Sequence, residues 1–305
     1  MRYARLFNKV RICRHGLMVF NPNDAYVGRS LDLYGEFTEA EIELLGRIAE
    51  DGAVVVDVGA CIGTHTIPLA RAVGPTGTVY AFEPQRLLFQ TLCANLALNS
   101  ITNVFAHQAA LGDQPGVLFA QSVDPRCHTN FAGLSLRSSS PGEPMSVITL
   151  DGLELERLHL VKIDVEGMEH TVIEGAVKMI ARCRPVLYVE NDRNDRSDEL
   201  IACIARQGYR MFWHTPMLYN PENFMKCEEN VFGEIAALNL LCLPEDGRWV
   251  PEDFADVEGF SPEPVRVPRT RIRQPRAKEI RVPTPIGPMR FSLPTTEDDD
   301  EETSP

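Results

Sequence analysis

The stretch from Val54 to Gly63 reads VVVDVGACIG and decides the fold. It begins with consecutive β-branched residues, which are typical of a strand buried on both faces of a sheet. Asp57 breaks the apolar run near the end of this strand, and the loop after it has the spacing Gly59-x-x-x-Gly63. A buried strand that leads through a glycine loop into a helix predicts a ligand-binding loop at the carboxyl end of a parallel strand.

Short apolar runs and helical patterns continue to alternate through the following sequence. This β-α-β alternation predicts an α/β protein with a doubly wound, mostly parallel sheet, because parallel strands need crossover helices. The pattern predicts seven strands in all, and the last of them is expected to be antiparallel. The expected strands are residues 53–56, 78–82, 104–107, 160–165, 186–189, 209–213 and 235–243.

The domain expected from this alternation spans residues 37–243. Its first helix follows Thr38-Glu39-Ala40-Glu41, a sequence typical of a capping box. Residues 114–148 interrupt the alternation with Gly, Pro and Ser clusters and two β-like pieces, near 117–120 and 146–150. We interpret this segment as an inserted hairpin or loop over the mouth of the cleft.

The two ends of the chain differ from this domain. Residues 1–36 alternate irregularly and carry the turn signal Asn21-Pro22-Asn23-Asp24, which predicts an N-terminal arm with a short hairpin. Residues 244–305 are rich in proline, with a basic stretch at 266–281 and an acidic run at 297–302. Such a tail has few apolar residues to bury, and its composition predicts disorder.

The composition limits the partners and the compartment. The 305 residues include 43 acidic and 30 basic ones, and a net charge of −13 disfavours nucleic acid, which needs a basic footprint. The eight cysteines form no C-x-x-C motif and indicate reduced thiols. The N-terminus lacks a secretory apolar core, and no run is long enough to span a membrane. We therefore expect a cytoplasmic protein.

Acidic residues end the first two expected strands, and their charge bears on the ligand. Asp57 would repel a diphosphate at the glycine loop and would attract the cationic groups of S-adenosylmethionine. Glu83, 26 residues further on, stands where a carboxylate can accept the protons of ribose hydroxyls. Asp57 could instead be a helix-capping acid. Beyond the third strand, Asp113 or a backbone amide at Ala109–Ala110 is a candidate adenine contact.

The fourth expected strand ends in Asp164, followed by Glu166 and Gly167. Ligands bind outside the carboxyl ends of parallel strands, so we expect Asp164 to face the cleft, and Asp164 or Glu166 is the candidate general base. With Glu190 and Asn191 after the next strand, Asp164 could hold a divalent cation. The alternative is that these are solvated acids at strand ends.

These motifs together resemble the FkbM family of methyltransferases. The matching motifs are VDVGACIG (56–63), YAFEP (80–84), ALGD (110–113), TLD (149–151) and VKIDVEG (161–167). The resemblance implies a Rossmann-like class I methyltransferase fold, S-adenosylmethionine as donor, and O-methylation of a sugar, a glycan or another small molecule. It places donor contacts at Gly59, Ala60, Cys61 and Gly63. Cys61 departs from the Asn that is usual in the family, and a backbone contact would survive this change.

Three other classes of protein stay open. An NAD-dependent oxidoreductase shares the βαβ start, although the loop spacing and Asp57 argue against it. A non-catalytic binding protein that keeps the fold is the second alternative, and the charged tail is its best support. A nucleic-acid amino-methyltransferase would be expected to carry Asn/Asp-Pro-Pro-aromatic where this chain has Asp164-Val165-Glu166-Gly167. The sequence sets no oligomeric state.

Overall fold

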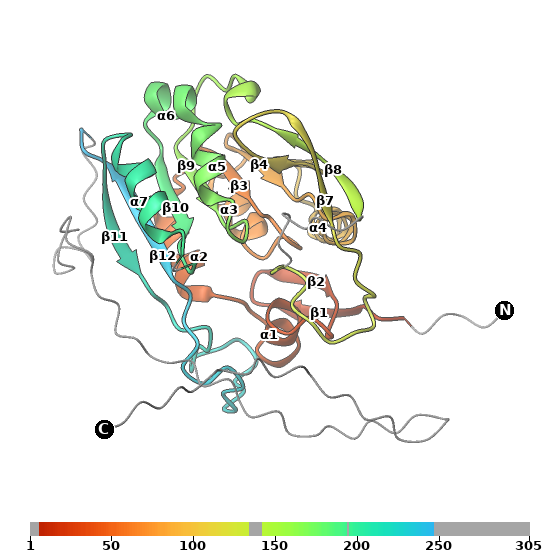
Figure 1. Cartoon of the computed structure of the whole chain (residues 1–305). Coiled ribbons are helices and arrows are strands. Elements are labelled where there is room, and N and C mark those ends of the chain that lie inside the picture. The colour runs from red at the N-terminus through yellow and green to blue at the C-terminus, as the bar shows by residue number, and fades with distance from the viewer. Residues whose placement is uncertain (1–5, 134–141, 194, 247–305) are drawn as a thin grey trace, which may run out of the picture. The chain divides into compact units, whose positions relative to one another are not determined.

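The structure is a computed structural model, and it describes residues 6–133, 142–193 and 195–246. Its central sheet has the strand order β11-β12-β10-β9-β3-β4-β5 (Figure 1). In chain order these strands are β3 (Val54–Val58), β4 (Thr78–Phe82), β5 (Val104–His107), β9 (Leu160–Ile163), β10 (Val186–Glu190), β11 (Tyr209–His214) and β12 (Asn239–Pro244).

The strand directions confirm the predicted sheet. β3 pairs in parallel with β4 on one side and with β9 on the other. β12 pairs antiparallel with both β10 and β11, so the last strand in the chain is the reversed one. The chain order changes direction at β3, and ligands bind beside such a switch point in doubly wound sheets.

Helices cover both faces of the sheet, which explains the β-branched run of the first strand. Val55 and Val56 follow each other in β3 and are both fully buried, although their side chains point to opposite faces. Val55 packs in a cluster with Leu45 and Leu69, whereas Val56 belongs to a cluster with Ile180. The helices are α2 (Glu39–Ile48), α3 (Thr66–Ala72), α4 (Arg86–Leu98), α5 (Glu169–Glu174), α6 (Val177–Cys183) and α7 (Ser197–Ala205).

One helix start differs from its prediction. α2 begins at Glu39 as expected, but the Thr38 side chain makes no capping hydrogen bond, so the predicted capping box is wrong. Thr38 adopts a left-handed conformation with φ of 46°, and its hydroxyl lies 3.2 Å from Nε2 of His65. A tertiary contact has taken the hydroxyl that a local cap would use.

Two small sheets stand beside the central one. β1 (Lys9–Cys13) and β2 (Gly16–Phe20) form a hairpin in the N-terminal arm, followed by α1 (Val27–Leu33). β6 (Ala110–Leu111), β7 (Gly116–Ala120) and β8 (Glu143–Ile148) form a three-stranded sheet that includes both β-like pieces of the inserted segment. The hairpin turns at Arg14 and His15, ahead of the Asn21–Asp24 turn signal.

The tail falls almost wholly outside the described residues. β12 extends to Pro244, and the predicted disordered tail beyond residue 246 lies outside the described ranges. Among the helices that the structure describes, none combines the length and apolar character needed to cross a membrane.

Asn95 of α4 joins the N-terminal hairpin to the glycine loop. This residue is fully buried, and its Oδ1 accepts a hydrogen bond from the Val19 amide at 2.6 Å. Its Nδ2 donates to the carbonyls of Val19 and Ile62 at 3.0 and 2.8 Å. On the edge of β2 that does not pair with β1, a side-chain amide thus satisfies the backbone groups of Val19. The same amide supports the loop that follows β3.

We predict that Asn95→Leu lowers the free energy of unfolding by about 3 kcal/mol, because it leaves three buried backbone groups without partners. A thermal melt should then show a midpoint lowered by roughly 6–10 °C. Gln90→Leu, at an exposed position of the same helix, should change the free energy of unfolding by less than about 0.5 kcal/mol. Equal effects of the two changes would contradict this role of Asn95.

Candidate functional site

Acidic side chains gather where four strands of the central sheet end. Asp57 is the residue before the last one of β3, and Glu83 follows β4 directly. Asp164 follows β9, and Glu190 is the last residue of β10. The carboxyl ends of β3, β4, β9 and β10 lie at one edge of the sheet because these strands are parallel neighbours. Figure 1 shows β10 and β11 pointing toward the side where α1 and the hairpin lie.

The glycine loop turns sharply after β3. Gly59, Cys61 and Gly63 all have positive φ, at 80°, 50° and 93°. A Cβ atom on Gly59 would lie 1.8 Å from the carbonyl oxygen of Asp164, so this loop requires glycine where it touches the end of β9. At Cys61 the left-handed conformation explains why asparagine, which tolerates it better, suits this position.

Glu83 ties the end of β4 to the glycine loop. Its Oε2 accepts the backbone N–H of Cys61 at 2.9 Å, and its Oε1 accepts that of Gln85 at 2.8 Å. Burial raises the pKa of Glu83 to about 8, because the surrounding protein replaces the water that would solvate its charge. Each carboxylate oxygen has a further lone pair to offer a hydroxyl group.

Asp57 is fully buried and faces a cation of the protein itself. Its Oδ2 accepts the Thr66 hydroxyl at 2.6 Å, and its Oδ1 has no hydrogen-bond partner. The Nζ atom of Lys162 lies 3.6 Å from Oδ1. Sequence reasoning missed Lys162, although a lysine within the apolar run Leu160–Ile163 was a signal that could have identified it.

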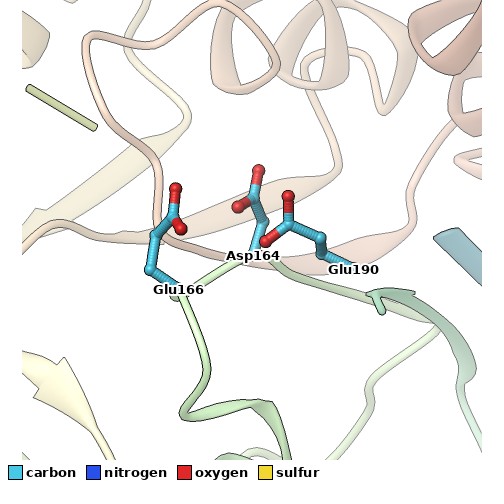
Figure 2. Close-up of side chains that lie close together, drawn as sticks. All are labelled: Asp164, Glu166 and Glu190. Atoms are coloured by element: carbon cyan, nitrogen blue, oxygen red, sulfur yellow. The ribbon is translucent and has the colours of Figure 1, made fainter. Parts of the chain in front are cut away.

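Asp164, Glu166 and Glu190 form an acid cluster, and one carboxylate oxygen of each lies within 4.8 Å of the others. Figure 2 shows the carboxylates of Asp164 and Glu190 side by side, with Glu166 on the other side of Asp164. Glu166 and Gly167 have positive φ, and this tight turn brings Glu166 back toward Asp164. Oε1 of Glu169 accepts the backbone N–H groups of Val165 and Gly167 and holds the turn.

The three acids differ in their tendency to ionise. Burial opposes ionisation of Asp164, but the Lys162 ammonium 3.3 Å away, His65 and a hydrogen bond from Glu190 together outweigh it and lower the pKa of Asp164. Burial and the charge of Asp164 raise the pKa of Glu190 well above its usual value. The same two causes raise the pKa of Glu166 to about 7, although the Arg193 guanidinium donates a hydrogen bond to it.

The acid cluster contains two of the three residues predicted as ligands of a divalent cation. Asp164 and Glu190 are in it, and Glu166 joins them, while the Asn191 amide donates to the Ser197 hydroxyl at 2.9 Å. Glu190 Oε2 is buried and has no hydrogen-bond partner. Lys162 and Arg193 already contact two of the three acids, and a divalent ion would compete with both.

Two of the predicted donor contacts lie away from the acid cluster. Ala110 is buried in β6, where it pairs with Val147. Asp113 is exposed, and its Cα lies 3.2 Å from where a Cβ on Gly175 would be. Gly175 ends α5, whereas the acid cluster lies at the start of that helix. The structure therefore does not bring Asp113 to the acid cluster.

A second buried polar group lies at the end of the glycine loop, and sequence reasoning did not connect its members. His65 precedes α3 and is 5% exposed. Its Nε2 lies 3.4 Å from the Glu41 carboxylate and 3.2 Å from the Thr38 hydroxyl. The first turn of α2 and the residue before it thus contact the histidine that follows the glycine loop.

A cavity of about 200 Å³ adjoins the glycine loop. Cys61 and Ile62 line it, together with Asp24 of the N-terminal arm, Leu88 of α4 and Phe131 of the inserted segment. The Asp24 carboxylate accepts backbone N–H groups from the arm and from Phe131, which joins the two segments. Parts of the chain outside the β-α-β core therefore form part of the walls of this cavity.

The sheet order and the acid-edged glycine loop define a Rossmann-like class I methyltransferase fold. The profile of the methyltransferase FkbM domain matches residues 57–211, about half of the chain. The chain belongs to the FkbM methyltransferase family.

Two named relatives and one solved structure are similar to this chain. It is 28% identical over 148 residues to Methyltransferase 1 of Beauveria bassiana, covering 41% of this chain, and 31% identical over 155 residues to the hexuronic acid methyltransferase AglP of Haloferax volcanii, covering 49%. The matched region spans 59% of each relative. The FkbM methyltransferase structure from Methylobacillus flagellatus is 18% identical, with a TM-score of 0.45, over 63% of this chain and 44% of that one.

We predict that Glu83 makes stability fall with pH over a defined window. Its pKa is about 8 in the fold against 4.5 as the ordinary value, so the unfolded chain releases the proton first. The stability is fully present below about pH 4.5 and is lost as the pH rises through about 8. In urea unfolding, the free energy of unfolding of wild type, taken relative to that of Glu83→Gln, should therefore fall as the pH rises through this window.

The control for this prediction is Glu143→Gln, which changes an exposed acid paired with Arg86. The Arg86 guanidinium keeps the pKa of Glu143 below 4.5, so Glu143→Gln should leave the slope between pH 5 and 8 unchanged. A Glu83→Gln difference that stays constant over this range would contradict the raised pKa of Glu83.

Proposed function

We propose that this protein is an S-adenosylmethionine-dependent methyltransferase that methylates a hydroxyl group of a sugar, a glycan or another small molecule. The observation that carries the proposal is the meeting of the glycine loop with the acids of β3, β4 and β9 at one sheet edge, in a chain of the FkbM family. The loop and Glu83 offer a donor site, and the acid cluster offers a proton acceptor.

The proposed donor site consists of Asp57, Glu83 and the backbone of the glycine loop at Gly59, Ala60, Cys61 and Gly63. The donor supplies an electrophilic methyl carbon on a sulfonium centre. More acids than cations lie around the loop, and burial keeps Glu83, Glu166 and Glu190 ready to ionise when a positive charge approaches. The site therefore favours a cationic ligand over a diphosphate. This charge also disfavours the alternative of an NAD-dependent oxidoreductase. Contacts from Ala110 and Asp113 stay predictions.

Within the acid cluster, the pKa values favour Glu166 as the general base. Asp164 is paired with Lys162 and has a lowered pKa, so its carboxylate is a weak proton acceptor. Glu166 has a pKa of about 7, close to the pH at which a base is both ionised and able to hold a proton. In the proposed reaction Glu166 takes the proton of the acceptor hydroxyl, and Asp164 keeps the site negatively charged.

Two observations support a sugar or another small molecule as the acceptor: the name of one relative and the negative charge of the protein and its site. The name of the Haloferax volcanii protein gives hexuronic acid as its substrate, which supports a sugar acceptor here. The net charge of −13 and the acidic site disfavour a nucleic acid, and its exclusion stays a prediction. A divalent cation at Asp164 and Glu190 also stays a prediction, with no role in the proposed reaction.

We predict that Glu83→Ala and Asp57→Ala each weaken S-adenosylmethionine binding at least about 100-fold, since each removes a buried charge-assisted contact. Calorimetry at pH 7 should also show proton release on binding to wild type, because a cation next to Glu83 lowers its pKa from about 8. Asp32→Ala, an acid of α1 paired with Lys9, is the matched control and should bind normally. Wild-type affinity for S-adenosylmethionine in both Glu83→Ala and Asp57→Ala would contradict the proposed donor site.

We predict that Glu166→Gln lowers methyl transfer by about 10²–10⁴-fold while donor affinity stays within a few-fold of wild type. The wild-type rate should rise about tenfold per pH unit up to about pH 7 and level off above it, because the base acts when ionised. The measurement is incorporation of a labelled methyl group into a panel of neutral and uronic glycosides. A pH-independent rate, or normal turnover by Glu166→Gln, would assign the base elsewhere. Donor binding without transfer to any acceptor would favour a binding protein.

A further inference from the structure

Lys162 is a buried lysine of β9, near the edge of the sheet where the carboxyl ends of the parallel strands and their acids lie. It is 2% exposed, and its position in β9 pairs with Asp57 in β3. Its Nζ lies 3.3 Å from Oδ2 of Asp164 and 3.6 Å from Oδ1 of Asp57. A lysine so deeply buried needs partners that compensate for its lost hydration, and the two carboxylates supply that compensation.

The same ammonium group reaches the glycine loop. Nζ of Lys162 donates a hydrogen bond to the carbonyl oxygen of Gly59 at 3.3 Å. The Asp164 amide donates to the Val58 carbonyl at 3.1 Å, and Gly59 packs directly on the Asp164 carbonyl. One side chain therefore contacts the acid of β3, the first turn of the loop and the acid that follows β9.

Lys162 lies between Asp57, beside the glycine loop, and Asp164, which belongs to the acid cluster. Asp57 Oδ1 receives no hydrogen bond and depends on the charge of Lys162. Asp164 contacts Lys162 and lies between the other two acids of the cluster (Figure 2). The groups facing Lys162 from neighbouring elements also include Glu41 of α2. Without the ammonium, neighbouring buried carboxylates would repel one another and move apart or take up protons.

We infer that Lys162 is a positioning residue that fixes the donor loop and the acid cluster in one common geometry. This inference rests on the proposed function, because it assigns the contacts of Lys162 to donor binding and to proton acceptance. Through Gly59 and Asp57, Lys162 holds the loop that binds the donor. Through Asp164, it holds the negatively charged residue next to the base. A displacement of about 1 Å between these halves costs about 100-fold in rate.

The test uses Lys162→Gln and Lys162→Met in the full chain. Glutamine keeps hydrogen-bond donors without the charge, and methionine keeps the length of the side chain without either. We expect both variants to raise the dissociation constant of S-adenosylmethionine about 10-fold in calorimetry and to lower kcat, at saturating donor and acceptor, about 100-fold. Lys178→Gln, an exposed lysine of α6, is the control and should change neither value.

The outcomes separate this inference from the proposed function. A structural role alone predicts a lower melting temperature with normal donor affinity and kcat, and that result in a folded variant would overturn the inference. If one of the two variants does not fold, the folded one decides. A wild-type protein that binds no donor contradicts the proposed function, whereas a wild-type protein that binds and transfers, with Lys162→Gln equal to it within threefold, contradicts this inference alone.

Discussion

The contact between Lys162 and Asp57 is the interaction on which the rest of the site depends. Both side chains are buried on adjacent parallel strands, so each charge lowers the cost of burying the other. Because Lys162 also contacts Gly59 and Asp164, the strand pairing at the centre of the sheet fixes the loop and the acid cluster together. The relative positions of the glycine loop and the acid cluster therefore follow from the register between β3 and β9.

Local patterns predicted the sheet and most of the site. A β-branched run such as Val54–Val56 is a strong strand signal, and the glycine spacing after it placed the loop correctly. Asp57, Glu83, Asp164 and Glu190 could be placed at one edge because parallel strands share the direction of their carboxyl ends. These predictions needed only the period of the strands and the alternation with helices.

The missed features depend on contacts between segments far apart in the chain. Lys162 meets Asp57 across 105 residues, and the Thr38 hydroxyl meets His65 where a local capping box was expected. Asn95 closes the edge of the N-terminal hairpin, although nothing in its own helix distinguishes it from a surface amide. In each case a polar side chain finds a tertiary partner, and no local pattern records that choice.

The contacts of Lys162 change which charges can attract the proposed donor. From the sequence, Asp57 alone would attract the sulfonium, but Lys162 already offsets that charge. The remaining attraction comes from Glu83 and the acid cluster, where burial raises the pKa of Glu83, Glu166 and Glu190. Such acids are partly protonated near neutral pH and ionise more readily when a cation approaches. In the proposed function, donor binding and ionisation of these acids would therefore be linked, because the positive charge of the donor favours their ionised forms.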